Sequence, residues 1–175
     1  MKYLVVIDMQ KDFTTGVLGN PQTAGVIQNV VDKINEFKNN EPDGKIIATL
    51  DTHYENYLDS QEGKYLPVPH CIRGTDGWQL EDEVKNALPS DAAIIEKLTF
   101  GSKQLPEYIT NPDEVDEIQV IGVCTDICVI SNAMILKAFY PEIPIKVVSN
   151  CCAGVTPESH DNALSAMRSC QIIVE

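Results

Sequence analysis

Short runs of apolar residues recur along the chain, and most of them are continuous rather than alternating with polar residues. Such runs are typical of strands that helices cover on both faces of a parallel sheet. Segments between several of these runs instead repeat their apolar residues at helical spacing. The predicted strands are residues 3–8, 45–51, 92–97, 118–123, 145–150 and 171–175.

Three segments have the helical pattern: residues 23–40, 126–139 and 157–170. The first places Val26, Ile27, Val30, Ile34 and Phe37 on one face, and the last has Pro157 at a suitable first helical position. Because strands alternate with helices, the sequence predicts an α/β fold: a doubly wound, mainly parallel six-stranded sheet with helices on both faces, a Rossmann-like three-layer sandwich. With no repeat or convincing linker, we expect residues 1–175 to form a single domain.

Ionisable side chains gather where the predicted strands end. They are Asp8 after the first strand, Asp51 and His53 after the second, Glu96 and Lys97 at the third, and Cys124 to Cys128 after the fourth. In an open α/β sheet, ligands bind beyond the carboxyl ends of the strands, so we expect these groups to share one edge. The segment from about 51 to 80 is long for a connection, which indicates a functional or locally structured loop.

Charge and hydropathy exclude two classes of partner. The chain has 26 acidic and 13 basic residues, a formal net charge of −13, and no basic cluster to attract a phosphate backbone, so we expect no nucleic acid partner. No apolar run reaches the roughly 18–20 residues that span a bilayer, and residues 1–13 resemble a first strand more than a signal peptide. We therefore expect a cytoplasmic protein without a membrane partner; whether it forms a homo-oligomer is left open.

Cys124 and Cys128 lie at a predicted strand-to-helix turn, and three roles compete for them. The two cysteines could be metal ligands, small buried side chains, or part of a site in which one of them is a nucleophile. A structural zinc site usually has a second tight pair of ligands, and none stands out here. Buried packing is the expectation for the other late cysteines, Cys151, Cys152 and Cys170.

The nucleophile hypothesis is strongest for Cys128. Thr125 or Asp126 can cap a helix, which would place Cys128 in its first turn, where free N–H groups and the helix dipole favour a thiolate. Lys97 would favour the thiolate further, and Asp8 could accept the thiol proton. Asp8, Lys97 and Cys128 would then supply a base, a cation and a nucleophile.

Five stretches together resemble the cysteine hydrolase superfamily of isochorismatase-like fold, and most of all its nicotinamidases. They are VIDMQKDF (6–13), DTH (51–53), PHCIRGTDG (69–77), EKLTF (96–100) and GVCTDICV (122–129), and they follow the family's order. Residues 149–164 resemble the family's closing segment. The resemblance implies that the small-molecule substrate is an amide, nicotinamide, which is hydrolysed to nicotinate and ammonia through a cysteine thioester, a reaction of NAD metabolism.

The family's catalytic residues fall on Asp8, Lys97 and Cys128. The resemblance also implies a cis peptide bond between Val123 and Cys124, and an oxyanion hole formed by the backbone N–H groups of Cys124 and Cys128. Cys124 would then act through its backbone alone.

The resemblance further implies one divalent metal ion bound by Asp51, His53 and His70, with Glu62 our candidate for the fourth ligand. Zinc is the first expectation, and iron or manganese also suit oxygen and imidazole ligands. Phe13 and Phe100 resemble the aromatic residues that enclose the substrate ring in the family. His160 is expected to have a structural role, and the sequence assigns no role to Trp78 or to residues 101–116.

Two alternatives remain. The substrate could be another of the superfamily's, an isochorismate-type ether or an N-carbamoyl or ureido compound, and a non-catalytic binding protein could share the fold. The metal ligands argue against the ether, because its hydrolysis needs no anchor for a pyridine nitrogen. The intact set of Asp8, Lys97 and Cys128 argues against a protein that only binds.

Overall fold

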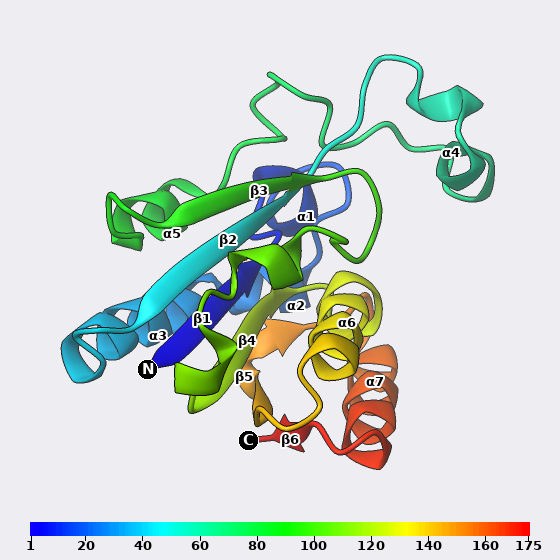
Figure 1. Cartoon of the computed structure of the whole chain (residues 1–175). Coiled ribbons are helices and arrows are strands. Elements are labelled where there is room, and N and C mark those ends of the chain that lie inside the picture. The colour runs from blue at the N-terminus through cyan, green and yellow to red at the C-terminus, as the bar shows by residue number, and fades with distance from the viewer.

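The computed structural model describes residues 1–175 as an α/β fold built on one six-stranded sheet (Figure 1). The strand order is β3-β2-β1-β4-β5-β6, and every neighbouring pair is parallel. The strands are β1 (Lys2–Ile7), β2 (Lys45–Asp51), β3 (Ala93–Lys97), β4 (Glu117–Val123), β5 (Ile145–Ala153) and β6 (Ile173–Val174). The predicted fold class and the six predicted strands are confirmed, although β5 extends to Ala153 and β6 keeps only two residues.

The sheet is buried on both faces, and this explains the continuous apolar runs. In β1, Tyr3, Val5 and Ile7 join one hydrophobic cluster, whereas Leu4 and Val6 join a second cluster on the opposite face. This division follows from the alternation of side chains along a strand. Each face of β1 therefore needs apolar residues, and none of these five is more than 1% exposed.

Helices cover both faces of the sheet. The cluster that contains Leu4 includes side chains of α1 (Lys11–Thr14), α3 (Ile27–Asn40) and α5 (Asp82–Ala87). The cluster that contains Tyr3 includes side chains of α6 (Ile130–Phe139) and α7 (Pro157–Ser169). Figure 1 shows α6 and α7 together on one side of the strands. No helix is both long and apolar enough to cross a membrane.

The single helix predicted over residues 23–40 is wrong, because the segment forms two helices, α2 (Pro21–Gly25) and α3. The Asn20 side chain accepts hydrogen bonds from the N–H groups of Gln22 and Thr23, so a capped helix begins before the apolar pattern does. Val26 then separates the two helices. The predicted apolar face of α3 is nevertheless buried at Val30, Ile34 and Phe37.

The chain between residues 51 and 80 is locally structured, as predicted. It forms a short 3₁₀ helix, η1 (Tyr57–Asp59), and a short α-helix, α4 (Gln61–Tyr65). In Figure 1, α4 lies well outside the sheet, and the chain then returns toward the end of β2. There His53 pairs with Ile72 in an isolated parallel bridge. Residues 101–116 contain two more short 3₁₀ helices, η2 (Leu105–Tyr108) and η3 (Pro112–Glu114).

The turn after β4 differs from the one predicted. It is a π-helical turn, η4 (Thr125–Val129), and it begins at Cys124 without a side-chain cap. The expectation that Thr125 or Asp126 caps this helix is wrong, because both side chains bind elsewhere. Thr125 Oγ1 lies 2.7 Å from His160 Nδ1, and Asp126 Oδ1 accepts from the Val155 N–H at 3.1 Å. These two side chains therefore connect the turn to the start of α7.

All six cysteines are free. Cys151 and Cys152 are buried, as expected, but the prediction for Cys170 is wrong, because it is exposed at the end of α7. Cys170 is the C-cap residue of α7 and lies outside the buried face of the helix, which consists of Ala163, Leu164 and Met167.

Candidate active site and metal centre

Three predicted catalytic side chains meet at the carboxyl edge of the sheet. Because β3, β2, β1 and β4 are neighbours, the ends of these strands lie side by side. Lys97 Nζ lies 2.6 Å from Asp8 Oδ2 and 3.5 Å from Cys128 Sγ. It also lies 3.3 Å from Asp51 Oδ1 and donates to the Thr99 carbonyl at 3.1 Å. The lysine therefore connects the predicted base, the predicted nucleophile and a predicted metal ligand.

Glu96 is not part of this group. Side chains alternate along β3, so Lys97 is buried while Glu96 points to the exposed face. There Glu96 forms a two-point ion pair with Arg73, with distances of 2.8 and 3.1 Å.

Asp8 is placed to accept a proton. It is fully buried, and its Oδ1 accepts a hydrogen bond from Thr49 Oγ1 at 2.7 Å. Its Oδ2 faces Lys97 but receives no well-directed hydrogen bond, so this oxygen keeps a free lone pair. A buried carboxylate oxygen with acceptor capacity beside a thiol is suited to general base catalysis.

The electrostatics of the thiol differ from the prediction. Burial raises the pKa of Cys128 well above its ordinary value, the charge of Asp8 raises it further, and Lys97 opposes both. The expected effect of Lys97, which favours the thiolate, is present, but the burial of Cys128, which is only 4% exposed, outweighs it. Burial also raises the pKa of Asp8, against the effect of Lys97, which makes the carboxylate a stronger base.

The backbone around Cys124 has one of the two features that the resemblance implied, the cis peptide bond. The peptide bond between Val123 and Cys124 is cis. The Cys124 carbonyl accepts from the N–H groups of Ile127 and Val129, at 3.1 and 3.0 Å, which closes the π-helical turn. The Cys124 N–H has no backbone acceptor. The oxyanion role of the Cys124 and Cys128 N–H groups stays a prediction.

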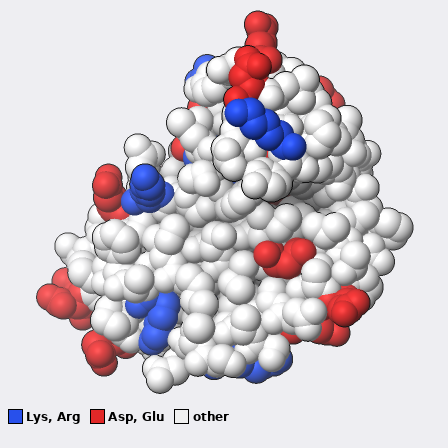
Figure 2. All heavy atoms as spheres, turned by 90° about the vertical axis from the view of Figure 1, so that its right-hand side faces the viewer, with Lys and Arg blue, Asp and Glu red and all other residues white.

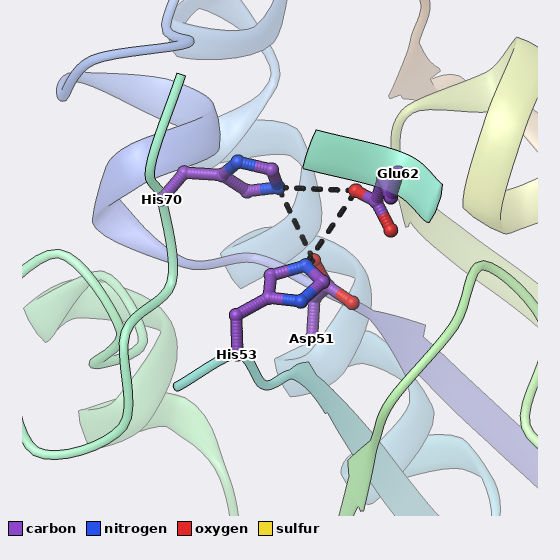
Figure 3. Close-up of side chains that lie close together, drawn as sticks. All are labelled: Asp51, His53, Glu62 and His70. Carbon is purple, nitrogen blue, oxygen red and sulfur yellow. Dashed lines mark hydrogen bonds and ion pairs between the residues drawn. The ribbon is translucent and has the colours of Figure 1, made fainter. Parts of the chain in front are cut away.

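The four predicted metal ligands converge from separate parts of the chain (Figure 3). Asp51, His53, Glu62 and His70 each offer one ligand atom, and these atoms all lie within 4.8 Å of one another. Asp51 Oδ2 lies 2.9 Å from His53 Nε2 and 3.5 Å from His70 Nε2. Glu62 Oε1 lies 3.5 Å from His53 Nε2 and 3.6 Å from His70 Nε2.

This donor set fits a divalent transition metal. Ligand bonds of about 2.0–2.2 Å give a tetrahedron with edges of about 3.4 Å, close to most of the separations in the cluster. His70 Nδ1 donates to the Val68 carbonyl at 2.8 Å, which leaves Nε2 free to bind an ion. Burial raises the pKa of Asp51, but the neighbouring His53, His70 and Lys97 outweigh it and hold that pKa well below its ordinary range. Asp51 therefore offers an anionic oxygen to a metal ion.

A cavity of about 240 Å³ joins the thiol to this cluster. Phe13 and Phe100, the two predicted aromatic residues, both line it. Phe13 is buried, with its ring 5.4 Å from that of His70, whereas Phe100 is 42% exposed. The remaining lining residues are Leu18, Asp51, Glu62, Leu66, His70, Cys124, Ile127, Cys128 and Val155. The cavity is therefore apolar, apart from the two thiols and three of the predicted metal ligands.

The whole chain matches one protein family. The model of the Isochorismatase domain family aligns with residues 2–175.

The chain belongs to the isochorismatase family.

Its relatives in this family include proteins named as nicotinamidases or pyrazinamidases. The chain is 24% identical to a nicotinamidase/pyrazinamidase of Mycobacterium tuberculosis, over 98% of this chain and 97% of the relative. The crystal structure of a nicotinamidase/pyrazinamidase from Bacillus subtilis superposes with a TM-score of 0.84 at 25% identity, covering 99% of this chain and 98% of that one. A pyrazinamidase of Pyrococcus horikoshii in complex with zinc gives a TM-score of 0.82 at 28% identity, with coverage of 99% and 98%.

Sequence reasoning missed residues that hold this candidate site together. Gln10 accepts from the Asp51 N–H and donates to the Asp51 carbonyl, both at 2.8 Å, and also donates to the Trp78 carbonyl at 2.9 Å. The Trp78 ring in turn donates to Thr52 Oγ1 at 2.9 Å. Gln10 lies within the VIDMQKDF stretch, two residues after Asp8, so its position was a signal that could have been used.

Tyr57 was also missed. Its ring packs edge-on against His53 and His70, with centroids 4.7 and 5.0 Å away. Its hydroxyl donates to the Leu66 carbonyl at 2.9 Å. No local pattern in the sequence distinguishes this tyrosine from its exposed neighbour Tyr54, because both lie in the same irregular segment.

Proposed function

We propose that this isochorismatase-family protein is a cysteine-dependent amidohydrolase that converts nicotinamide to nicotinate and ammonia. The observation that carries the proposal is the small apolar cavity that joins Cys128 to the cluster of Asp51, Glu62 and His70. A planar ring with an amide on one side and a basic nitrogen on the other suits such a cavity. The names of the relatives support the same substrate.

In the proposed mechanism, Asp8 accepts the Cys128 proton while Lys97 stabilises the negative charge that the pair shares. The thiolate attacks the amide carbonyl, and the N–H groups of Cys124 and Cys128 stabilise the oxyanion. Asp8 then returns the proton to the leaving nitrogen, and ammonia departs. Water, deprotonated by Asp8, attacks the remaining thioester to release the acid and restore the thiol.

The metal ion has an orienting role in this proposal. When bound by Asp51, His53, Glu62 and His70, it supplies a Lewis-acidic position for the pyridine nitrogen of the substrate. Zinc is the proposed ion, and the donor atoms also suit iron or manganese.

Nicotinamide and benzamide distinguish this function from that of a general amidase. Benzamide lacks the ring nitrogen, so we expect the metal-loaded enzyme to have a kcat/KM for benzamide lower by about 10²-fold or more. Ammonia release measures both rates. A protein that hydrolysed both amides equally well would be a general cysteine amidase, and the nicotinamidase proposal would be wrong.

The three histidines of the chain provide a matched test of the metal site. We expect one divalent ion per chain by elemental analysis, and loss of most of it in His53→Ala and His70→Ala. His160→Ala is the control, because His160 binds Thr125 and lies outside the cluster. A chelator should reduce nicotinamide turnover while changing the rate of Cys128 alkylation by iodoacetamide less than about threefold. Metal retention by both cluster variants would contradict the assignment.

A further inference from the structure

The segment after β3 forms one wall of the substrate cavity, and it lies against the helix that follows Cys128. Phe100 lines the cavity directly. At Gly101 the backbone approaches α6 so closely that an added Cβ would lie 2.5 Å from Ile135 Cδ1 and 3.4 Å from the Cβ of Ser131. The position of Phe100 therefore depends on how this segment sits on α6.

One buried side chain joins the two elements. Asn132, on α6, has no exposed surface. Its Nδ2 donates to the Phe100 carbonyl at 3.0 Å and to the Cys128 carbonyl at 2.8 Å. Its Oδ1 accepts from the Ser102 N–H at 2.9 Å. The amide thus uses both donors and its acceptor, and it binds the backbone on both sides of Gly101.

We propose that Asn132 is a positioning residue that holds Phe100 as the wall of the substrate cavity and so determines the preference for a flat aromatic amide. Asn132 does not line the cavity, so it acts through the segment that it holds. Only an amide side chain of this length offers two donors to two carbonyls and an acceptor to an N–H group at once. The proposal rests on the proposed function for its substrate, but the position of the wall can be tested without it.

A purely structural role would also leave Asn132 buried and hydrogen-bonded, so the test needs a readout that stability alone does not change. Removing the amide frees the segment from 100 to 102 to move away from the cavity. We therefore expect Asn132→Ala to raise the KM for nicotinamide by about tenfold or more while kcat changes less than about threefold.

The second readout is the selectivity of Cys128 alkylation. The quantity measured is the rate of Cys128 alkylation by an aromatic reagent, N-benzyl iodoacetamide, divided by the rate with iodoacetamide. This ratio should be higher when Phe100 is held in place than when it has moved away. We expect this ratio of rates to fall by about tenfold in Asn132→Ala. Mass spectrometry confirms that Cys128 is the residue modified.

Two further variants distinguish an effect on the position of Phe100 from an effect on the stability of the protein. Gly101→Ala leaves Asn132 intact but places a Cβ 2.5 Å from Ile135 Cδ1 and 3.4 Å from the Cβ of Ser131, so the segment or the Ile135 side chain must shift, and we expect the variant to reproduce both effects. Leu136→Ala removes a fully buried core side chain one turn along the same helix. It should lower the melting temperature but leave the KM for nicotinamide and the alkylation ratio unchanged. If Asn132→Ala does not fold, Gly101→Ala and Leu136→Ala decide the question.

The proposal is overturned if Gly101→Ala and a folded Asn132→Ala keep the wild-type KM and alkylation ratio, or if Leu136→Ala changes them equally. If the wild type releases no ammonia from nicotinamide but the alkylation ratio responds as expected, the nicotinamidase assignment is wrong. The positioning role of Asn132 then still stands. The two proposals can therefore fail separately.

Discussion

Cys128→Ala is expected to lower kcat by about 10⁴-fold or more, because the thiol that lies beside Lys97 and Asp8, and that forms the thioester in the proposed mechanism, is lost. The change removes one sulfur atom from a buried position, which is a modest packing loss. The variant should therefore keep the wild-type fold and its metal content. Cys124→Ala is the matched comparison, because Cys124 lines the same cavity, four residues earlier in the chain.

We expect Cys124→Ala to retain activity within about tenfold, since the mechanism uses only its backbone N–H. Steady-state ammonia release from nicotinamide measures both variants, and circular dichroism checks the fold. Equal loss of activity in the two variants would contradict the division of roles. Such a result, together with loss of bound metal in both, would favour the view that the two thiols act as ligands.

The sequence alone was sufficient to predict the sheet and most of the site, because these depend on local features. Continuous apolar runs identified the strands, and the residue that ends each strand fell at one edge. Asp8, Asp51 and Lys97 follow directly from that rule, since parallel strands place their carboxyl ends together. The resemblance added His70 and Glu62, which come from a long loop and α4, where no periodicity could have placed them.

The features that were missed depend on contacts between distant parts of the chain. Thr125 looked like a helix cap because the sequence does not show that His160, thirty-five residues later, takes its hydroxyl. The burial of Cys128, which raises the pKa of its thiol, was missed because exposure cannot be read from a turn in the sequence. The role of Asn132 was not predicted, because it depends on hydrogen bonds to the backbone of Phe100 and Ser102.

Lys97 is the second residue for which we expect a large effect. Lys97→Met should lower kcat/KM by about 10²–10³-fold, because the site loses the positive charge that stabilises the thiolate. Lys97 is the one cause that lowers the pKa of the Cys128 thiol against burial and Asp8. Its removal should therefore raise that pKa further, and alkylation by iodoacetamide should require a higher pH, since only the thiolate reacts.

The variant also leaves Asp8 and Asp51 in a buried site without their cation, which is expected to cost roughly 3–5 kcal/mol of stability. Circular dichroism and the melting temperature must therefore show that the protein is folded at the temperature of the assay. The double variant Asp8→Asn, Lys97→Met removes one charge of each sign and should recover part of the lost stability.

Asp8→Asn makes the test of Lys97 specific, because it should move the thiol pKa in the opposite direction. The charge of Asp8 raises the pKa of Cys128, so its removal should lower that pKa and shift alkylation to lower pH. Turnover should nevertheless fall by about 10²–10⁴-fold, because the base that moves the proton is gone. Two variants that both lose activity would thus shift the alkylation profile in opposite directions. If Lys97→Met kept the wild-type profile, Lys97 would not stabilise the thiolate, and its role would be limited to holding Asp8 and Asp51 in place.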